Sequence, residues 1–416
     1  MNFKNIITKT IGVIFMMIPF LSVAQNTPLT LEQAIKIGVE NNGNIKAVNQ
    51  EIDKLNTLKK TSFGLDKTNF GMQYGQYNSL EKDFGFTIDQ NFKFPTVYTH
   101  QKQLNQAYIA QGEHQKLVTQ NDLIKEIKLN FYQIVYLNQL NDLLMYQDSL
   151  FERFFRASQL KFNTGESTYL EQVTAESKWI GVQAKLNENQ SNIKIYKAVL
   201  QALMYQKIKV DEIDDSNLKK TLTLDIDSSA LANNPQLKYY QNLIQVKEQE
   251  YKVNKANILP DFSIGYFNMS MKGNYDINGV NTYLGSDYRF QGVQATVSIP
   301  IFVRDDLAKN KAKQMDQQIA QTNAYNYQVY LNGQFERVVQ DFYKYKSLLD
   351  YYENSALPQA DLMIDNANKS YASGNIGYLE YYQVLNNAIE IKTNYLKLVN
   401  SYNQSIIAIE YLIGVK

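Results

Sequence analysis

The chain has 416 residues, enough for roughly two or three ordinary domains, and its 42 basic and 41 acidic side chains nearly cancel. This balance gives no reason to expect a nucleic acid as a partner. The absence of cysteine excludes disulfides, thiolate catalysis, cysteine-bound zinc and lipid attachment to an N-terminal cysteine. His100 and His114 lie far apart on one expected helix and make a poor metal pair, so we expect neither a metal nor a cofactor.

The first residues have the pattern of a secretory signal peptide. Lys4 and Lys9 precede an apolar run, and Ser22-Val23-Ala24 places small residues at the −3 and −1 positions of a cleavage site. We therefore expect a signal peptide at residues 1–24 and an exported protein. An uncleaved anchor is the alternative, although the apolar run is short for a membrane-spanning helix.

The first structural repeat is expected at residues 25–221, and it combines helical and strand patterns. Strands are expected at about 63–77 and 82–95. In the second of these strands, Phe84, Phe86 and Ile88 alternate with polar or small residues, which predicts one apolar and one polar face.

A helical pattern then runs from near Val97 to Phe162, about 65 residues or roughly 100 Å of α-helix, which is too long for a globular core. It ends at a tip expected at about 162–171. Gly165 supplies the left-handed conformation that ends a helix, and Thr168 with Glu171 has the capping-box spacing that starts the next one. A polar insertion is expected at about 207–221.

The second structural repeat, residues 222–416, follows the same order of helix, strand, strand, long helix, tip and helix. Its strands are expected at about 259–272 and 288–302, and its tip at about 371–380. In the first of these strands the apolar positions change phase after Tyr266, which suggests a β-bulge, and a long polar loop is expected after it, up to about residue 287. Pro358 allows a kink in the second long helix.

Strands with one apolar face in an exported protein indicate a membrane β-barrel, because the long helices extend away from the strands and leave none to cover that face. Four strands are too few to close a barrel, since the smallest single-chain barrels have about eight. Several copies must therefore combine, and three would give a twelve-stranded barrel. The pattern predicts a mainly α fold with a membrane β-barrel part, in which the helices enclose a tube.

Several short motifs occur in a fixed order over essentially the whole mature chain: Leu29-Thr30-Leu31-Glu32-Gln33-Ala34 with Asn41-Asn42, Asn233-Asn234-Pro235, Leu259-Pro260-Asp261-Phe262, Ile299-Pro300-Ile301-Phe302, and the two Gly…Leu-Glu tips. With them the sequence resembles the TolC-type outer membrane efflux family. The resemblance implies a homotrimer in the cell outer membrane, with a twelve-stranded barrel on a long periplasmic α-helical barrel and an equatorial belt at the polar insertion.

The resemblance also implies a passive function as the exit duct of a tripartite efflux or type I secretion system. The implied partners are a periplasmic adaptor (membrane fusion protein), an inner-membrane pump such as an RND-type or ABC transporter, and outer-membrane lipid. Drugs, metal ions and polypeptides all leave through this scaffold, and the pump selects among them.

In this family the tips close the tube at rest and contact the adaptor. The residues that correspond here are Gly165, Leu170, Glu171, Tyr371, Gly374, Leu379 and Glu380. Glu171 and Glu380 either form acidic rings that make the pore cation-selective, or act only as favourable charges at helix N-termini. The family's tip arginine falls on Ile376, so its salt bridge is absent here. Asp89, Asn91 and Lys93 are expected to line the barrel lumen.

Other classes of protein fit the sequence less well. An enzyme is not expected, because the sequence has no glycine-rich phosphate loop and no Ser-His-Asp set beyond chance. An exported trimeric coiled-coil adhesin is the alternative, but it predicts heptads without two pairs of amphipathic strands. A soluble adaptor typically has one helical hairpin beside β-rich domains.

Overall fold

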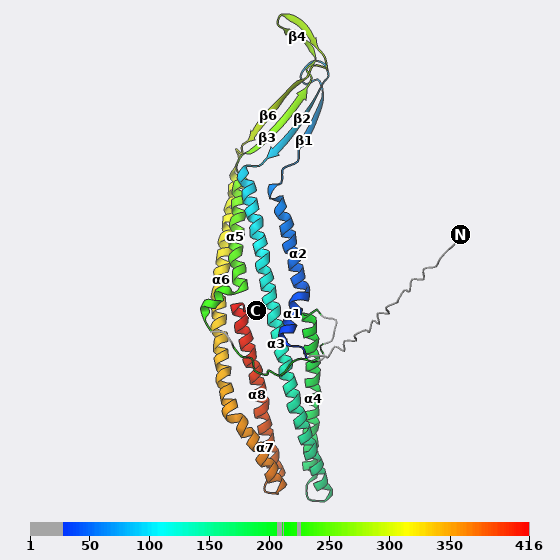
Figure 1. Cartoon of the computed structure of the whole chain (residues 1–416), viewed down its shortest axis with the longest axis vertical. Coiled ribbons are helices and arrows are strands. Elements are labelled where there is room, and N and C mark those ends of the chain that lie inside the picture. Colours follow the sequence, from blue (N-terminus) through cyan, green and yellow to red (C-terminus); the bar gives the residue numbers. More distant parts are fainter. Residues whose placement is uncertain (1–27, 206–209, 211, 223–225, 416) are drawn as a thin grey trace, which may run out of the picture.

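The computed structural model describes residues 28–205, 210, 212–222 and 226–415. The expected signal peptide, and residues 207–209 and 211 of the expected insertion, lie outside the described residues. The molecule is elongated, with a four-stranded sheet towards one end and the turns of two helical hairpins at the other (Figure 1).

Long helices form most of the described chain, and the longest, α3, has 69 residues and is therefore roughly 100 Å long. In the described part of the chain, every helix is too short or too polar to cross a membrane. The helices are α1 (Leu31–Asn41), α2 (Gly43–Leu58), η1 (Lys59–Phe63), α3 (Pro95–Asn163), α4 (Tyr169–Leu203), η2 (Ser228–Asn233), α5 (Pro235–Ala256), α6 (Arg304–Tyr351), the π-helix η3 (Tyr352–Ala356), α7 (Leu357–Ala372) and α8 (Tyr378–Ile413).

The sheet has the antiparallel order β1-β2-β3-β6, so that β1 and β6 are its two edges. Each strand lies within its expected range, but the first begins only at Asn69, because residues 59–63 form a 3-10 helix instead. The strands are β1 (Asn69–Gly75), β2 (Asp83–Phe92), β3 (Asp261–Met269), β4 (Gly273–Ile277), β5 (Val280–Leu284) and β6 (Phe290–Ser298).

The register of the sheet gives it two chemically different faces, because successive side chains of a strand point to opposite sides. Asp89 pairs with Gly265, which in turn pairs with Gln294, so these residues share one face. That polar face includes Gln73, Thr87, Asp89, Asn91, Ser263, Gln294 and Thr296. The apolar face includes Phe70, Met72, Tyr74, Phe84, Phe86, Ile88, Phe92, Phe262, Ile264, Tyr266, Val293, Ala295 and Val297.

Two expectations for the second pair of strands are wrong. The β-bulge is absent, since β3 pairs with β6 in unbroken register. Phe267 instead lies on the polar face over Gly292, where an added Cβ would be only 2.7 Å from its ring. The polar loop up to residue 287 contains the hairpin β4–β5, whose turn places Asn278 and Gly279 at φ 57° and 82°.

The second long helix bends where the sequence allows a kink (Figure 1). Pro358 has no N–H and cannot donate to the preceding turn, and the π-helix η3 absorbs the break immediately before it. At the end of η3, the Leu357 N–H donates to the Tyr352 carbonyl, five residues back. The long helix therefore consists of two segments, α6 and α7.

A strap, defined here as residues 212–222, crosses the helices between the sheet and the tips (Figure 1). Its beginning pairs with the N-terminal segment, because Leu29 N–H donates to Glu212 and Asp214 N–H donates to Leu29. Further along, Leu218 packs against three of the hydrophobic clusters between the helices. The strap thus connects the two repeats at mid-length.

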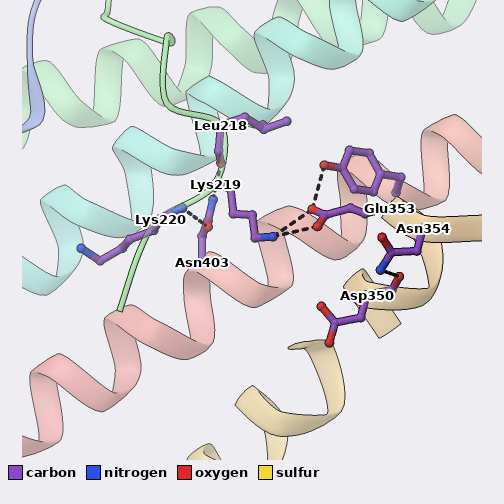
Figure 2. A network of polar contacts seen from close by, with 8 residues as sticks. Leu218, Lys219, Lys220, Asp350, Glu353, Asn354 and Asn403 are labelled. Carbon is purple, nitrogen blue, oxygen red and sulfur yellow. Dashed lines mark hydrogen bonds and ion pairs between the residues drawn. The ribbon is translucent and has the colours of Figure 1, made fainter. Parts of the chain in front are cut away.

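Polar contacts fix the strap to α8 and to the π-helix (Figure 2). Buried Asn403 of α8 donates to the Leu218 carbonyl at 2.7 Å and accepts from the Lys220 N–H at 2.8 Å. Lys219 Nζ contacts both carboxylate oxygens of Glu353 in η3, at 2.9 and 3.0 Å. The strap is therefore attached at the bend of the second long helix.

Candidate functional site

Both tips are built from the same helix-ending turn. In the first, Gly165 has φ 78°, its N–H donates to Phe162, and the Glu166 N–H donates to Lys161. These two bonds define a Schellman motif, which needs a left-handed residue at the glycine position.

The second tip has the same two backbone hydrogen bonds as the first. Gly374 has φ 75°, its N–H donates to Tyr371, and the Asn375 N–H donates to Ser370. An added Cβ would meet nothing within 4 Å at either Gly165 or Gly374, so the left-handed backbone is what requires glycine there.

The helices that leave the two tips start differently. Thr168 caps α4, because its hydroxyl accepts from the Glu171 N–H at 3.3 Å. Gly377 stands at the corresponding position before α8 and has no side chain to cap it. The second tip therefore lacks one hydrogen bond that the first tip has.

Equivalent leucines project from the two tips. Leu170 is 74% exposed and Leu379 is 64% exposed. Each precedes an acid, of which Glu380 is exposed and Glu171 is half-buried. The tips thus present a matched pair of apolar side chains at the end of the molecule.

Four aromatic residues, which we call the tip clasp, join the two hairpins: Phe154, Tyr371, Tyr378 and Tyr381. Phe154 of α3 stacks on Tyr378 of α8, with ring centroids 4.5 Å apart and an interplanar angle of 15°. Its ring also lies 5.7 Å from that of Tyr381 and 6.3 Å from that of Tyr371. One side chain of the first hairpin therefore contacts three of the second.

The clasp gives Tyr371 defined neighbours. Its ring stacks on that of Tyr381 at 4.4 Å, and Lys161 Nζ of the first hairpin lies 5.1 Å from its centroid. Ile376, which stands where the family has arginine, packs against the buried cluster of the same tip region. Apolar and aromatic packing thus occupies the region in which the resemblance implies a salt bridge.

Glu171 acts on the second hairpin electrostatically. Burial has the largest effect on the pKa of Tyr378, and the nearby Glu171 carboxylate has the next largest; the pKa is raised to about 12. The buried Tyr378 hydroxyl has no hydrogen-bond partner among the described residues. The structure thus brings Glu171, Tyr371 and the clasp into one region.

The expected lumen residues lie at the other end of the chain, on or beside the sheet (Figure 1). Asp89 accepts from Gln294 Nε2 at 2.9 Å, across Gly265, whose missing side chain leaves room for this contact. Lys93 Nζ forms an ion pair with Asp261 at 2.7 Å. Asn91 lies on the same face as Asp89. Clusters of three or more His, Cys, Asp or Glu that could hold a metal are absent from the described residues.

Sequence reasoning missed Phe154, Tyr378 and Tyr381. The signal for two of them was the density of tyrosine after the second tip, at Tyr378, Tyr381 and Tyr382. Gln294 and Asp261, the partners of the expected lumen residues, depend on the pairing between strands.

Comparison with known proteins bears on the fold. No family model and no curated protein sequence matches the chain significantly. Among solved structures, the outer-membrane channel OprN matches with a TM-score of 0.78 and 13% identity, over 93% of this chain and 90% of that one. This chain has the fold of this outer-membrane channel.

Two further outer-membrane proteins support the same fold. The Campylobacter jejuni CmeC outer membrane channel matches with a TM-score of 0.75 and 14% identity, over 92% of this chain and 85% of that one. The outer membrane protein VceC from Vibrio cholerae matches with a TM-score of 0.74 and 14% identity, over 92% and 96%. This breadth of coverage means that the channel fold includes both the sheet and the tips.

Proposed function

We propose that this protein is the subunit of an outer-membrane exit duct. The observation that carries the proposal is a two-faced, four-stranded sheet at the end of helices roughly 100 Å long. An apolar face of this kind suits contact with lipid, and the polar face suits a water-filled lumen. OprN and CmeC, which share the fold, are described as outer-membrane channels.

The open edges of the sheet favour a closed assembly of several copies. In this chain β1 and β6 are edge strands, and unpaired backbone groups are costly in a bilayer. Pairing β6 of one copy with β1 of the next would close the barrel without free edges. We propose a homotrimer, with a twelve-stranded barrel in the outer membrane and the helices as a periplasmic tube.

The duct would be passive, and its periplasmic partners would meet it at the tips. Leu170 and Leu379 are exposed at equivalent places, as expected of side chains that fit grooves of another protein. We propose a periplasmic adaptor as that protein, with an inner-membrane pump that supplies the cargo. This arrangement would be part of a tripartite efflux or type I secretion system.

The tips would also close the duct at rest. Gly165 and Gly374 shape the turns, and Glu171 and Glu380 follow them at the start of the returning helices. In a trimer these acids would form rings of like charge that attract cations and separate as the tips open. The acids also suit the N-terminal ends of α4 and α8, where they interact favourably with the helix dipole.

Single-channel conductance in planar bilayers tests the proposal. The wild type should give a small conductance with cation preference, and Glu171→Ala/Glu380→Ala should enlarge the conductance or abolish the preference. Glu166→Ala is the matched control, because Glu166 is an exposed tip acid outside both positions. If the double variant behaves like the wild type, the acids are only helix caps. If a folded oligomer forms no pore, the duct is refuted and the coiled-coil adhesin is favoured again.

A further inference from the structure

An apolar cavity of about 630 Å³ lies where the sheet meets the helices. It is bounded by η1, by the ends of β2 and β3, and by the first two turns of α3. Phe63, Phe92, Tyr98 and Phe262 supply most of its apolar wall. The cavity therefore lies at the border between the sheet and the helical part of the molecule.

The wall of the cavity continues the apolar face of the sheet. Phe92 and Phe262 are directly paired in the β2–β3 ladder and lie on the same face as Ile88 and Tyr266. Phe63 packs against Tyr98 with ring centroids 4.7 Å apart and the rings tilted by 42°, yet it is 68% exposed. A hydrocarbon chain lying along Tyr266, Ile264 and Phe262 of β3 could thus extend into the cavity over apolar side chains.

The rim of the cavity carries a free positive charge. Lys93 is neutralised by Asp261 at 2.7 Å, whereas Lys102 forms no ion pair with any described residue and its side chain is exposed. The Tyr98 oxygen accepts the Lys93 N–H at 3.0 Å, so its own proton is available to an acceptor. Lys59 and Lys60 of η1 precede Phe63 and add positive charge to this segment.

We propose that this cavity binds one anionic glycerophospholipid from the periplasmic leaflet of the membrane. The acyl chain would lie along Phe63, Phe92 and Phe262, and Lys102 Nζ and the Tyr98 hydroxyl would hold the phosphate. The apolar wall selects a lipid over free phosphate, and the unpaired lysine selects an anionic headgroup. The proposal rests on the proposed function, since it requires the apolar face to contact the membrane.

A neighbouring copy of the chain is a poorer occupant of the cavity. β2 and β3 are the central strands, whereas a neighbour would join the sheet at β1 or β6. In the corresponding region of the second repeat, Phe302 beside the start of α6 is 93% exposed. Lys311 lies as far into α6 as Lys102 lies into α3 and provides a matched control.

Native mass spectrometry of the purified assembly, in detergent micelles with equal amounts of phosphatidylglycerol and phosphatidylethanolamine, tests the proposal. The wild type and Lys102→Arg should retain phosphatidylglycerol preferentially. Lys102→Glu should reduce its retention at least about five-fold, while Lys311→Glu should leave it within about two-fold of the wild type. Phe63→Ala should lower the retention of both lipids, because it removes part of the apolar wall.

Three results would overturn the lipid site: no retained phosphatidylglycerol in the wild type, unchanged retention in Lys102→Glu, or an equal loss in Lys311→Glu. Conductance of the same preparations separates this outcome from failure of the duct. A wild-type pore without retained lipid refutes only the lipid site. A folded wild-type oligomer that forms no pore refutes the duct, and with it the membrane contact on which the lipid site depends.

Discussion

The tip clasp predicts that Phe154→Ala opens the duct. Phe154 is 5% exposed, and it is the only clasp residue that belongs to the first hairpin, where α3 approaches α8. Truncation to alanine removes its contacts with Tyr371, Tyr378 and Tyr381 together but leaves the turn at Gly165 intact. The second hairpin should then separate from the first more readily.

The expected size of the effect follows from the ring contacts. An aromatic pair contributes about 0.5–1.5 kcal/mol beyond its buried area, so three pairs contribute about 1.5–4.5 kcal/mol. Even the lower value changes the ratio of closed to open tips roughly ten-fold, since 1.4 kcal/mol is a factor of ten. A buried Phe→Ala change costs about 3–5 kcal/mol in all. The part of this cost that does not change the ratio of closed to open tips should appear as a lower free energy of unfolding.

The open fraction of single channels in planar bilayers measures this change. Phe155→Ala is the matched control, because Phe155 stacks on Trp179 of α4 at 5.6 Å and so joins two helices of the same hairpin. Phe154→Ala should raise the open fraction roughly ten-fold or more, and Phe155→Ala should lower stability without this effect. Equal open fractions in the two variants would refute the clasp as the contact that holds the tips closed.

Three further predictions concern the cap, the lumen and a half-buried carboxylate. Gly377→Ser should stabilise the second tip by about 0.5–1 kcal/mol, because it adds the missing cap at a φ of −80° that serine adopts, and a lower thermal midpoint would contradict this. Gly265→Ala should break the Asp89–Gln294 contact, because its Cβ would overlap the Asp89 carboxylate, and unchanged assembly and ion selectivity would contradict this. Burial raises the pKa of Glu250, but hydrogen bonds from lysines and a tyrosine outweigh it and hold this pKa below its ordinary value. The stability from these bonds is present above about pH 4.5 and is lost as the pH falls through the lowered pKa. The wild type should therefore lose helical circular dichroism as the pH falls, and Glu250→Gln should make this loss smaller.

The order of elements could be predicted because it depends on local patterns. Alternation of aromatic and polar side chains defined β2, and Gly165 and Gly374 defined turns that the structure places at the same points. The hairpin β4–β5 could also have been found. Asn278-Gly279 between alternating apolar residues is a strong hairpin signal, which the polar character of the surrounding segment obscured.

The contacts that join the hairpins could not be predicted, because they depend on which face of one helix meets another far away in the sequence. Phe154 has the same local pattern as Phe155, yet one contacts the second hairpin and the other contacts α4. The ion pair of Lys219 with Glu353 likewise requires the strap to cross the π-helix. The expected bulge in β3 failed for a similar reason, since Gly292 on the neighbouring strand leaves room for Phe267.

The unequal construction of the two long helices has a mechanical consequence. α3 is a single lever from Pro95 beside the sheet to Asn163 at the tip, and since it is roughly 100 Å long, a tilt of about one degree moves its end by roughly 2 Å. The helix of the second repeat has a joint at Tyr352–Ala356, and Lys219 of the strap is attached there. A displacement of the second tip can therefore be absorbed at mid-length, whereas a displacement of the first is transmitted to the sheet.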